Sequence, residues 1–555
     1  MMRKSLRKFI GYFFDLERID NIRYAIRFHL LVKEKYQKPL APISKSIVPK
    51  KGDKRILVPL IETNHYGIIH SLSLAKALQI RGGQVKVLVC DGTLSGCEIK
   101  SVKNEHLKNP CFKCKFNIKN IVRLFGLETI NFSDYLSDDT MKKIEFEVDQ
   151  ITDAGGTSLI IDGIDLKQCI EDSILRYYYG AVPSDKEIEG VTRKKHLRTA
   201  LISLEFAKSI DSIWNPDLVL NNMSVYSSWS PLFKYFNKKG ENIFQVVTMT
   251  PFDYKKVIIN PDSLYKSSAR YKNYCLLRKD KDLNSNEKNI LNQFISRRVS
   301  GTNPQFNDFG GWFDQNVDKE SLVNRLKIDR KKKNIFLFSN IYWDVGISDY
   351  GRLYEGVIEW VLDTIKICKN NNDLHLYIKT HPAEIFDSSS SIKGIHQIIK
   401  DNYPILPKNL TIISPNDKIS PYGLFEFIDL GVIFNGTIGL EMMLGGIPII
   451  TTGRTVFGES NLCEEPKTRQ NYASLITQME PHKTPSDNQV QLFAYFYFIK
   501  TLIPWNLNKI AYKGSIQDGL NYKTIKSLDA NKNKYLDHVC KYLLNPEELG
   551  IDNWD

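Results

Sequence analysis

Short apolar runs alternate with helical patterns over the first half of the chain. RILVPL at 55–60 and VKVLVC at 85–90 enclose a segment from Ser71 to Gln79 that has a helical pattern. Strands covered on both faces read as continuous apolar runs, and a helix between two of them makes a βαβ unit. LVLN at 218–221 and FQVVTM at 244–249 predict two more buried strands. The pattern therefore predicts a parallel α/β sheet in this half.

The same alternation restarts in the second half, where a helical pattern near 353–368 follows the first of a new set of β-rich runs. These runs are IFLFSN at 335–340, LHLYIK at 374–379, TIIS at 411–414, GVIF at 431–434 and IPIIT at 447–451. Short strands that alternate with helices are typical of doubly wound sheets. We therefore predict an α/β fold with two Rossmann-like doubly wound domains that face an interdomain cleft.

Changes in composition divide the chain into five parts. We expect a basic amphipathic N-terminal extension at 1–50, a first Rossmann-like domain at 51–296, an interdomain linker at 297–333, a second Rossmann-like domain at 334–480 and a C-terminal helical region at 481–555. The extension would either attach to an anionic membrane surface or pack on its own domain. The pattern does not say which domain the C-terminal region contacts.

Composition and charge restrict the class of protein. The 555 residues are 42% hydrophobic and 25% charged, which excludes a mainly disordered or fibrous chain. The net charge of +13 favours partners that carry phosphate or other anions. Apolar runs are too short for a transmembrane helix, and the first 20 residues lack the apolar core of a secretory signal. A cytoplasmic location is expected, and nine cysteines are too few for a disulfide scaffold.

Polar residues follow two strands of the second predicted sheet. The candidates are Lys379, His381, Pro382, Asn435, Gly436, Thr437 and Glu441. The carboxyl ends of parallel strands meet at the ligand-binding edge of an open sheet, so these residues should lie close together. A lysine and the amides of a helix N-terminus would hold a phosphate there. As structural alternatives, His381 would be a turn residue and Thr437 a helix cap.

Two motifs in this half, KTHPAE at 379–384 and FNGTIGLEMMLGGIPIITTG at 434–453, resemble those of bacterial capsule polysaccharide biosynthesis glycosyltransferases, which are related to Kdo transferases. SNIYWDVG at 339–346 fits the same resemblance, which is strongest over 330–460. It implies the GT-B fold, with a first domain that binds the acceptor and a second that binds a nucleotide-sugar donor.

The resemblance also implies roles for particular residues. His381, Pro382 and Thr437 would hold the phosphate of the donor nucleotide. Many relatives have serine where this chain has Thr437, and a hydroxyl remains. In other GT-B enzymes an acidic residue near the position of Glu441 binds a ribose or sugar hydroxyl.

The first domain supplies the candidates for a general base, because inverting transfer needs a group that takes the proton of the acceptor hydroxyl. Glu62 and His65 lie in the loop after the first strand, and Asp91 follows the second strand. Bacterial sialyltransferase-like enzymes carry an acidic residue before glycine as the base, and by that analogy Asp91 is the strongest candidate. The alternative for Asp91 is a plain Asp-Gly turn.

Four cysteines cluster within 25 residues: Cys90, Cys97, Cys111 and Cys114. The last two have the spacing that lets both thiolates reach one metal ion, so a structural zinc ion or an iron-sulfur cluster is one interpretation. Separate core cysteines are the other. The transfer itself is expected to need no cofactor, because cations such as Lys379 can neutralise the leaving phosphate.

The sequence therefore predicts a glycosyltransferase that moves a sugar from a nucleotide-sugar donor onto a capsular or surface polysaccharide or a lipid-linked glycan. CMP-Kdo, or a related acidic sugar, is the first donor that the resemblance suggests. Peripheral contact with the inner membrane is one expectation, and no nucleic acid is expected as a partner. Three alternatives stay open: a UDP-N-acetylglucosamine 2-epimerase-like enzyme, a CDP-glycerol phosphotransferase-like enzyme and a non-catalytic scaffold of polysaccharide assembly.

Overall fold

A computed structural model places most of the chain. It describes residues 22–23, 25–26, 53–61, 65–104, 110–153, 159–221, 223–240, 242–247, 256–261, 267–279, 281–300, 318–344, 351–385, 390–482, 484–504 and 528–545. Most of the predicted extension at 1–50 lies outside these residues. None of the described helices is both long enough and apolar enough to cross a membrane.

The first sheet, within the described residues, has seven strands in the order β14-β8-β7-β6-β1-β2-β3. Its strands are β1 (Arg55–Leu60), β2 (Gln84–Val89), β3 (Glu128–Asn131), β6 (Leu218–Asn221), β7 (Asn242–Val247), β8 (Lys256–Pro261) and β14 (Ile503–Pro504). The run from β7 to β3 is parallel, whereas β8 and β14 are antiparallel to their neighbours. The parallel part therefore has the Rossmann-like order in which a crossover joins its two halves.

Helices cover both faces of this sheet because its strands are apolar on both sides. In β1, Ile56 and Val58 belong to one buried cluster and Leu57 to the other, as the two-residue period of a strand requires. The first cluster includes side chains of α4 (His65–Ile80), α5 (Pro110–Leu124) and α19 (Lys534–Leu544). The second includes side chains of α6 (Asp138–Asp153), α7 (Lys167–Tyr177), α8 (Lys186–Trp214) and α9 (Tyr226–Lys239). A small hairpin, β4 (Ile160–Ile161) and β5 (Ile164–Asp165), precedes α7.

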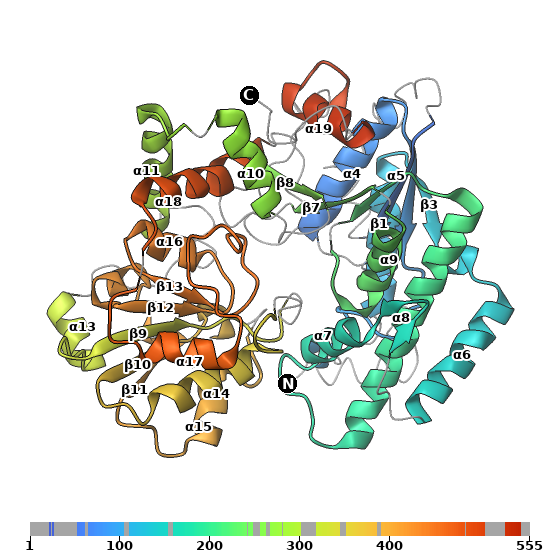
Figure 1. The fold of residues 1–555 in the computed structure, drawn as a ribbon. Helices are drawn as coiled ribbons and strands as arrows, with labels where there is room; N and C mark the ends of the chain where they lie inside the picture. Colours follow the sequence, from blue (N-terminus) through green and yellow to red (C-terminus); the bar gives the residue numbers. More distant parts are fainter. Residues whose placement is uncertain are drawn as a thin grey trace.

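The second sheet has the order β11-β10-β9-β12-β13 in the described part of the chain, and all its pairs are parallel. Its strands are β9 (Lys333–Phe338), β10 (Leu374–Lys379), β11 (Leu410–Ile413), β12 (Leu430–Ile433) and β13 (Ile449–Thr451). One face is covered by α14 (Val357–Cys368), α15 (Ile395–Asn402) and α17 (Arg469–Thr477). The other is covered by α10 (Ser267–Arg278), α11 (Ser285–Val299), α13 (Lys319–Leu326), α16 (Ile438–Leu444) and α18 (Asp487–Tyr495). The two sheets confirm the predicted pair of Rossmann-like domains (Figure 1).

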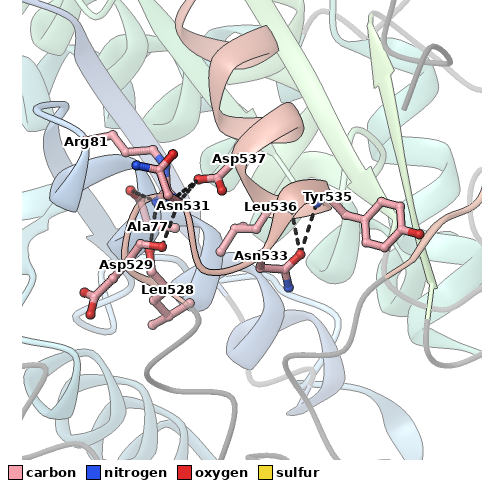
Figure 2. A network of polar contacts seen from close by, with 9 residues as sticks. All are labelled: Ala77, Arg81, Leu528, Asp529, Asn531, Asn533, Tyr535, Leu536 and Asp537. Atoms are coloured by element: carbon pink, nitrogen blue, oxygen red, sulfur yellow. Dashed lines mark hydrogen bonds and ion pairs between the residues drawn. The ribbon is translucent and has the colours of Figure 1, made fainter. Parts of the chain in front are cut away.

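The chain returns to the first sheet after α18. Strand β14 pairs with β8, and α19 packs against α4 (Figure 1). Figure 2 shows Arg81, at the end of α4, reaching the segment that leads into α19. Its guanidinium donates to the carbonyl oxygens of Leu528 and Asp529 and pairs with the carboxylate of Asp537. Within the described part of the C-terminal region, β14 and α19 therefore brace the first domain, whereas α18 packs on the second.

The two halves of the chain also touch directly. The hydroxyl of Tyr342, just after β9, donates to the carbonyl oxygen of Gly180 at 3.0 Å. The amide of Ile392 donates to the carbonyl oxygen of Tyr179 at 3.2 Å, and the ring of Tyr179 packs edge-on against Trp343. These contacts attach the loop after β9 to the segment that follows α7.

Candidate functional site

A pocket of about 270 Å³ opens at the carboxyl ends of three strands of the second sheet. Its lining comprises Arg298, Phe338, Ser339, Asn340, Lys379, Thr380, His381, Pro382, Pro421, Tyr422, Asn435, Gly436, Thr437, Ile438 and Glu441. All seven residues that the sequence suggested for the donor are among them. The structure therefore brings together two motifs that lie more than fifty residues apart in the chain.

Strand order explains this convergence. The central strand β9 lies between β10 and β12, and the direction of winding reverses there, which makes this edge the topological switch point of the sheet. The register sets Phe338 beside both Lys379 and Ile433, so the three strands end in one row. The residues that follow each strand must therefore lie next to one another.

Lys379 ends β10 and is only 5% exposed. Burial lowers the pKa of its ammonium group to about 8, since a charged amine loses hydration there, and Asp417 offsets part of that effect. A phosphate bound nearby would add an anionic neighbour to this cation and would favour its charged form. Lys379 is therefore placed to favour an anionic ligand.

His381 lies in the turn after β10, and its tautomer is set by the backbone. The amide of Ala383 donates to Nδ1 of His381 at 3.1 Å, so Nδ1 carries no proton and the ring proton lies on Nε2. Burial lowers the pKa of His381 to about 4, with a smaller contribution from Lys379. The ring is therefore neutral at physiological pH and offers an N–H donor rather than a charge.

Glu441 is held in a buried polar group at the base of the pocket. Its Oε1 pairs with Nη2 of Arg298 at 2.6 Å, and its Oε2 accepts from the hydroxyl of Tyr422 at 2.6 Å. Burial opposes the charge on Arg298, but Glu441 raises the pKa of Arg298 above its usual value. The carboxylate therefore has a structural role, and each oxygen keeps a lone pair for a ligand hydroxyl.

The loop after β12 presents its polar groups to the pocket. Gly436 has a φ of +135°, a conformation that L side chains rarely adopt, and the side-chain amide of Asn340 donates to the carbonyl oxygen of Asn435 at 2.9 Å. Thr437 precedes α16, and its side chain does not cap that helix. Since α16 has seven residues, its dipole adds less to anion binding than Lys379 does.

Ser339 provides an independent sign of ligand binding. Its side chain is 6% exposed and lines the pocket, yet its Oγ has no hydrogen-bond partner among the residues that the structure describes. A buried hydroxyl without a partner costs about 1–3 kcal/mol. A bound ligand would remove this penalty.

Eight residues that line the pocket were not singled out from the sequence as site residues, and those that matter most here are Arg298, Ser339, Asn340 and Tyr422. Ser339 and Asn340 directly follow the central strand, and that position was the available signal. Arg298 and Tyr422 had no such signal, because they reach the pocket from α11 and from a short 3₁₀ segment at Tyr422–Phe427.

Of the three candidate bases, only Asp91 has a described side chain. Glu62 is outside the described residues, and His65 begins α4 without a described side chain. Asp91 lines a different pocket, on the first domain. Burial alone would raise the pKa of Asp91, but hydrogen bonds from Ser133 and Thr93 lower it below the usual value. Asp91 is therefore a weak base in this state and anchors the loop around Gly92.

The four cysteines of the predicted metal site do not come together. No group of three or more His, Cys, Asp or Glu side chains in the described part of the chain is placed to bind a metal ion. Cys114 packs in the cluster on one face of the first sheet, whereas Cys90 packs against the cluster on the opposite face. Burial raises the pKa of Cys90 and of Cys97, which disfavours their thiolates. Cys114 therefore packs in the core of the first domain.

The two sheets and the pocket define a protein with two Rossmann-like domains and a ligand pocket in the second. No family model and no curated protein matches the chain. Among solved structures it is similar to the KpsC β-Kdo 2,4 transferase of Thermosulfurimonas dismutans, at 13% identity and a TM-score of 0.34, over 57% of this chain and 88% of that one.

Two other solved structures are similar over more of the chain. A putative UDP-N-acetylglucosamine 2-epimerase from Listeria monocytogenes is 10% identical with a TM-score of 0.22, over 79% of this chain and 94% of that one. A glycosyltransferase from Rickettsia africae is 10% identical with a TM-score of 0.26, over 86% of this chain and 100% of that one.

Proposed function

We propose that the protein is a glycosyltransferase that binds a nucleotide-sugar donor in the pocket of the second domain. The observation that carries the proposal is the convergence of Lys379, the Nε2–H of His381 and the unpartnered hydroxyl of Ser339 at the topological switch point. A cation and two neutral donors suit the oxygens of a phosphate group.

The same groups suit the transfer step. When the sugar leaves the nucleotide, negative charge grows on the phosphate oxygen that remains. Fixed donors and a cation in a buried site stabilise such charge without reorganising. Lys379 would supply the charge, and His381 would supply a hydrogen bond without losing its own proton. Glu441, held by Arg298 and Tyr422, would accept from a hydroxyl of the donor.

The donor, acceptor and location belong to the proposal. We propose CMP-Kdo or a related acidic sugar as the donor, and a capsular or surface polysaccharide or lipid-linked glycan as the acceptor, on the residues that resemble the capsule glycosyltransferases. The transfer reaction would take place in the cytoplasm, with the protein in peripheral contact with the inner membrane. Asp91 remains the proposed base, and its pKa would have to rise when the acceptor excludes water.

The test is thermal stabilisation by CMP, CDP, UDP, GDP and their common sugars. We expect one nucleotide to raise the melting temperature of the full chain, and His381→Ala to weaken its binding by about tenfold through loss of one hydrogen bond. His396→Ala, on α15 and outside the pocket, is the matched control. Equal nucleotide affinity of wild type and His381→Ala would contradict the proposal that the nucleotide binds in this pocket.

Reaction products then separate the remaining alternatives. A transferase releases the nucleotide only when an acceptor is present. Conversion of the donor without an acceptor would instead show an epimerase. Transfer of glycerol phosphate from CDP-glycerol to the acceptor, with release of CMP, would show a phosphotransferase. Nucleotide binding without turnover, and unchanged polymer synthesis in His381→Ala, would identify a scaffold.

A further inference from the structure

A second, larger pocket of about 610 Å³ lies on the first domain, between α5 and the edge strand β3. It extends from Asp91, at the end of β2, along α5 to Leu127 and Thr129 at β3. We call it the α5 groove. Its volume falls in the range of pockets that hold organic ligands, and it exceeds what a single inorganic anion needs. The donor pocket shares none of its lining residues.

One side of the α5 groove carries a line of cations. Lys115, Lys119 and Arg123 follow one another at four-residue intervals on α5, are exposed, and line the groove. Residues at this interval lie on the same side of a helix, at steps of about 6 Å along its axis. Among the described residues, none of the three forms an ion pair. Lys115 lies beside Gly92, where a Cβ would stand 3.4 Å from its Nζ.

The same helix shows why these cations face the groove. Another side of the helix is buried in the core of the first domain through Cys114, Ile118, Ile121 and Val122. The side of α5 that carries the cations therefore faces away from this core, and it lies beside β3, the last strand of the first sheet as described. Elsewhere on the domain, some exposed cations are paired with carboxylates, as Lys194 is with Asp149. The line on α5 is thus a strip of three cations within a concave surface, and Asp91 is the single carboxylate among the described residues that line the groove.

The remaining walls are aromatic and neutral polar. Phe112 and Phe116 are half-buried, and their rings stack with centroids 5.8 Å apart and an interplanar angle of 18°. They form one apolar platform beside the cations. Thr129, Asn131 and Ser133 add hydroxyl and amide groups. Aromatic faces attract the C–H groups of sugar rings, and amides and hydroxyls pair with sugar hydroxyls.

We infer that the α5 groove binds an anionic segment of a glycan, a chain of sugars that carries carboxylate or phosphate groups along one side. Cations at regular steps suit a linear polyanion better than a single ion, and the platform suits a sugar ring. The choice of a glycan rests on the proposed function, whereas the anion specificity follows from the groove itself. Nucleic acid fits less well, because the two rings stack on each other and do not offer separate platforms to successive bases.

The experiment uses the full chain, fluorescently labelled short oligogalacturonates, which carry a carboxylate on every ring, and neutral maltooligosaccharides. We expect the acidic probe to bind wild type at low salt, to weaken as salt rises, and to bind the triple variant Lys115→Gln, Lys119→Gln, Arg123→Gln about tenfold more weakly. The neutral probe should bind both proteins equally and weakly. Lys142→Gln, an exposed cation on α6 outside the groove, should bind like wild type.

Several results would overturn the inference. These are no binding of the acidic probe to wild type at low salt, equal binding to the triple variant, and tighter binding of single-stranded DNA through the same three residues. The nucleotide that stabilises wild type should also stabilise the triple variant, which shows that the variant is folded. If no nucleotide binds while binding of the acidic probe still requires the three cations, the proposed function is wrong, but the inference that the α5 groove binds an anionic chain is supported.

Discussion

Arg298 and Glu441 form an ion pair of 2.6 Å across 143 residues of chain. Arg298 lies in the last turn of α11, and Glu441 lies in the first turn of α16, behind the pocket. The exposed fractions of the two side chains are 7% and 3%. The pair therefore joins the helices that precede the second domain to the wall of its pocket.

Removing one partner of this pair should destabilise the protein strongly. Arg298→Met leaves Glu441 buried without its cation, which is expected to lower the free energy of unfolding by about 3–5 kcal/mol. The double variant Arg298→Met, Glu441→Gln should be more stable than Arg298→Met alone, because no uncompensated charge remains. Urea unfolding of wild type, Arg298→Met, Glu441→Gln and the double variant measures these free energies. Additive effects in the double variant would show that the pair is not coupled.

Ser339→Ala should separate stability from binding. Its hydroxyl has no partner among the described residues, so its removal should leave the free protein unchanged or stabilise it by up to about 1 kcal/mol. The stabilisation by nucleotide should fall in the same variant, because a ligand contact is lost. Melting temperatures with and without nucleotide measure both. A less stable free protein with full nucleotide binding would contradict a ligand role for Ser339.

Nucleotide affinity should depend on the protonation of Lys379. With a pKa of about 8 in the free protein, the amine is charged below that pH and binds an anion. Anion binding raises this pKa. The affinity should therefore fall by up to about tenfold per pH unit as the pH rises through 8, and it should level off once the pH exceeds the pKa of Lys379 in the complex.

Calorimetric titration between about pH 7 and about pH 9 avoids the second ionisation of a phosphate, near pH 6. Lys379→Met should bind more weakly at the lower pH and lose the pH dependence. Lys366→Met, on α14 and outside the pocket, is the control. The same slope in Lys379→Met and wild type would assign the titration to another group.

The brace between α4 and α19 should depend on Arg81. Arg81→Met removes its hydrogen bonds to Leu528 and Asp529 and its pair with Asp537, and should cost about 1–3 kcal/mol. Hydrogen exchange should then be faster in α19 and unchanged in α14. Arg81→Lys keeps the positive charge but lacks the planar guanidinium group with its several N–H donors. It should therefore recover only part of the protection of α19 against hydrogen exchange. Unchanged exchange in α19 would show that apolar packing alone holds it.

The strands and the donor-side candidates were predictable from the sequence. RILVPL, LVLN and LHLYIK coincide with β1, β6 and β10, because a strand covered on both faces needs a continuous apolar run. Lys379 and Thr437 were found by the same logic, since residues directly after parallel strands must share one edge of the sheet.

Other features depended on contacts between distant segments. The four-cysteine cluster is close in sequence, yet Cys90 and Cys114 face opposite sides of the first sheet. Arg298 reaches the pocket only because α11 packs on the second domain. The α5 groove likewise requires β3 at the edge of the sheet, and an apolar pattern does not give strand order.

The sequence by itself determined strands such as β1, β6 and β10 and the edge of the second sheet at which the two motifs around Lys379 and Thr437 meet, since a continuous apolar run and the point where it ends are local properties. Tertiary structure alone decided which charges are paired, which are buried and which stay open. Arg298 became an ion-paired cation and Lys379 a buried cation that lines the pocket because of their neighbours, and the return of α19 to α4 was set by packing between distant segments. Those outcomes depend on burial and on contacts between distant residues, which no local pattern encodes.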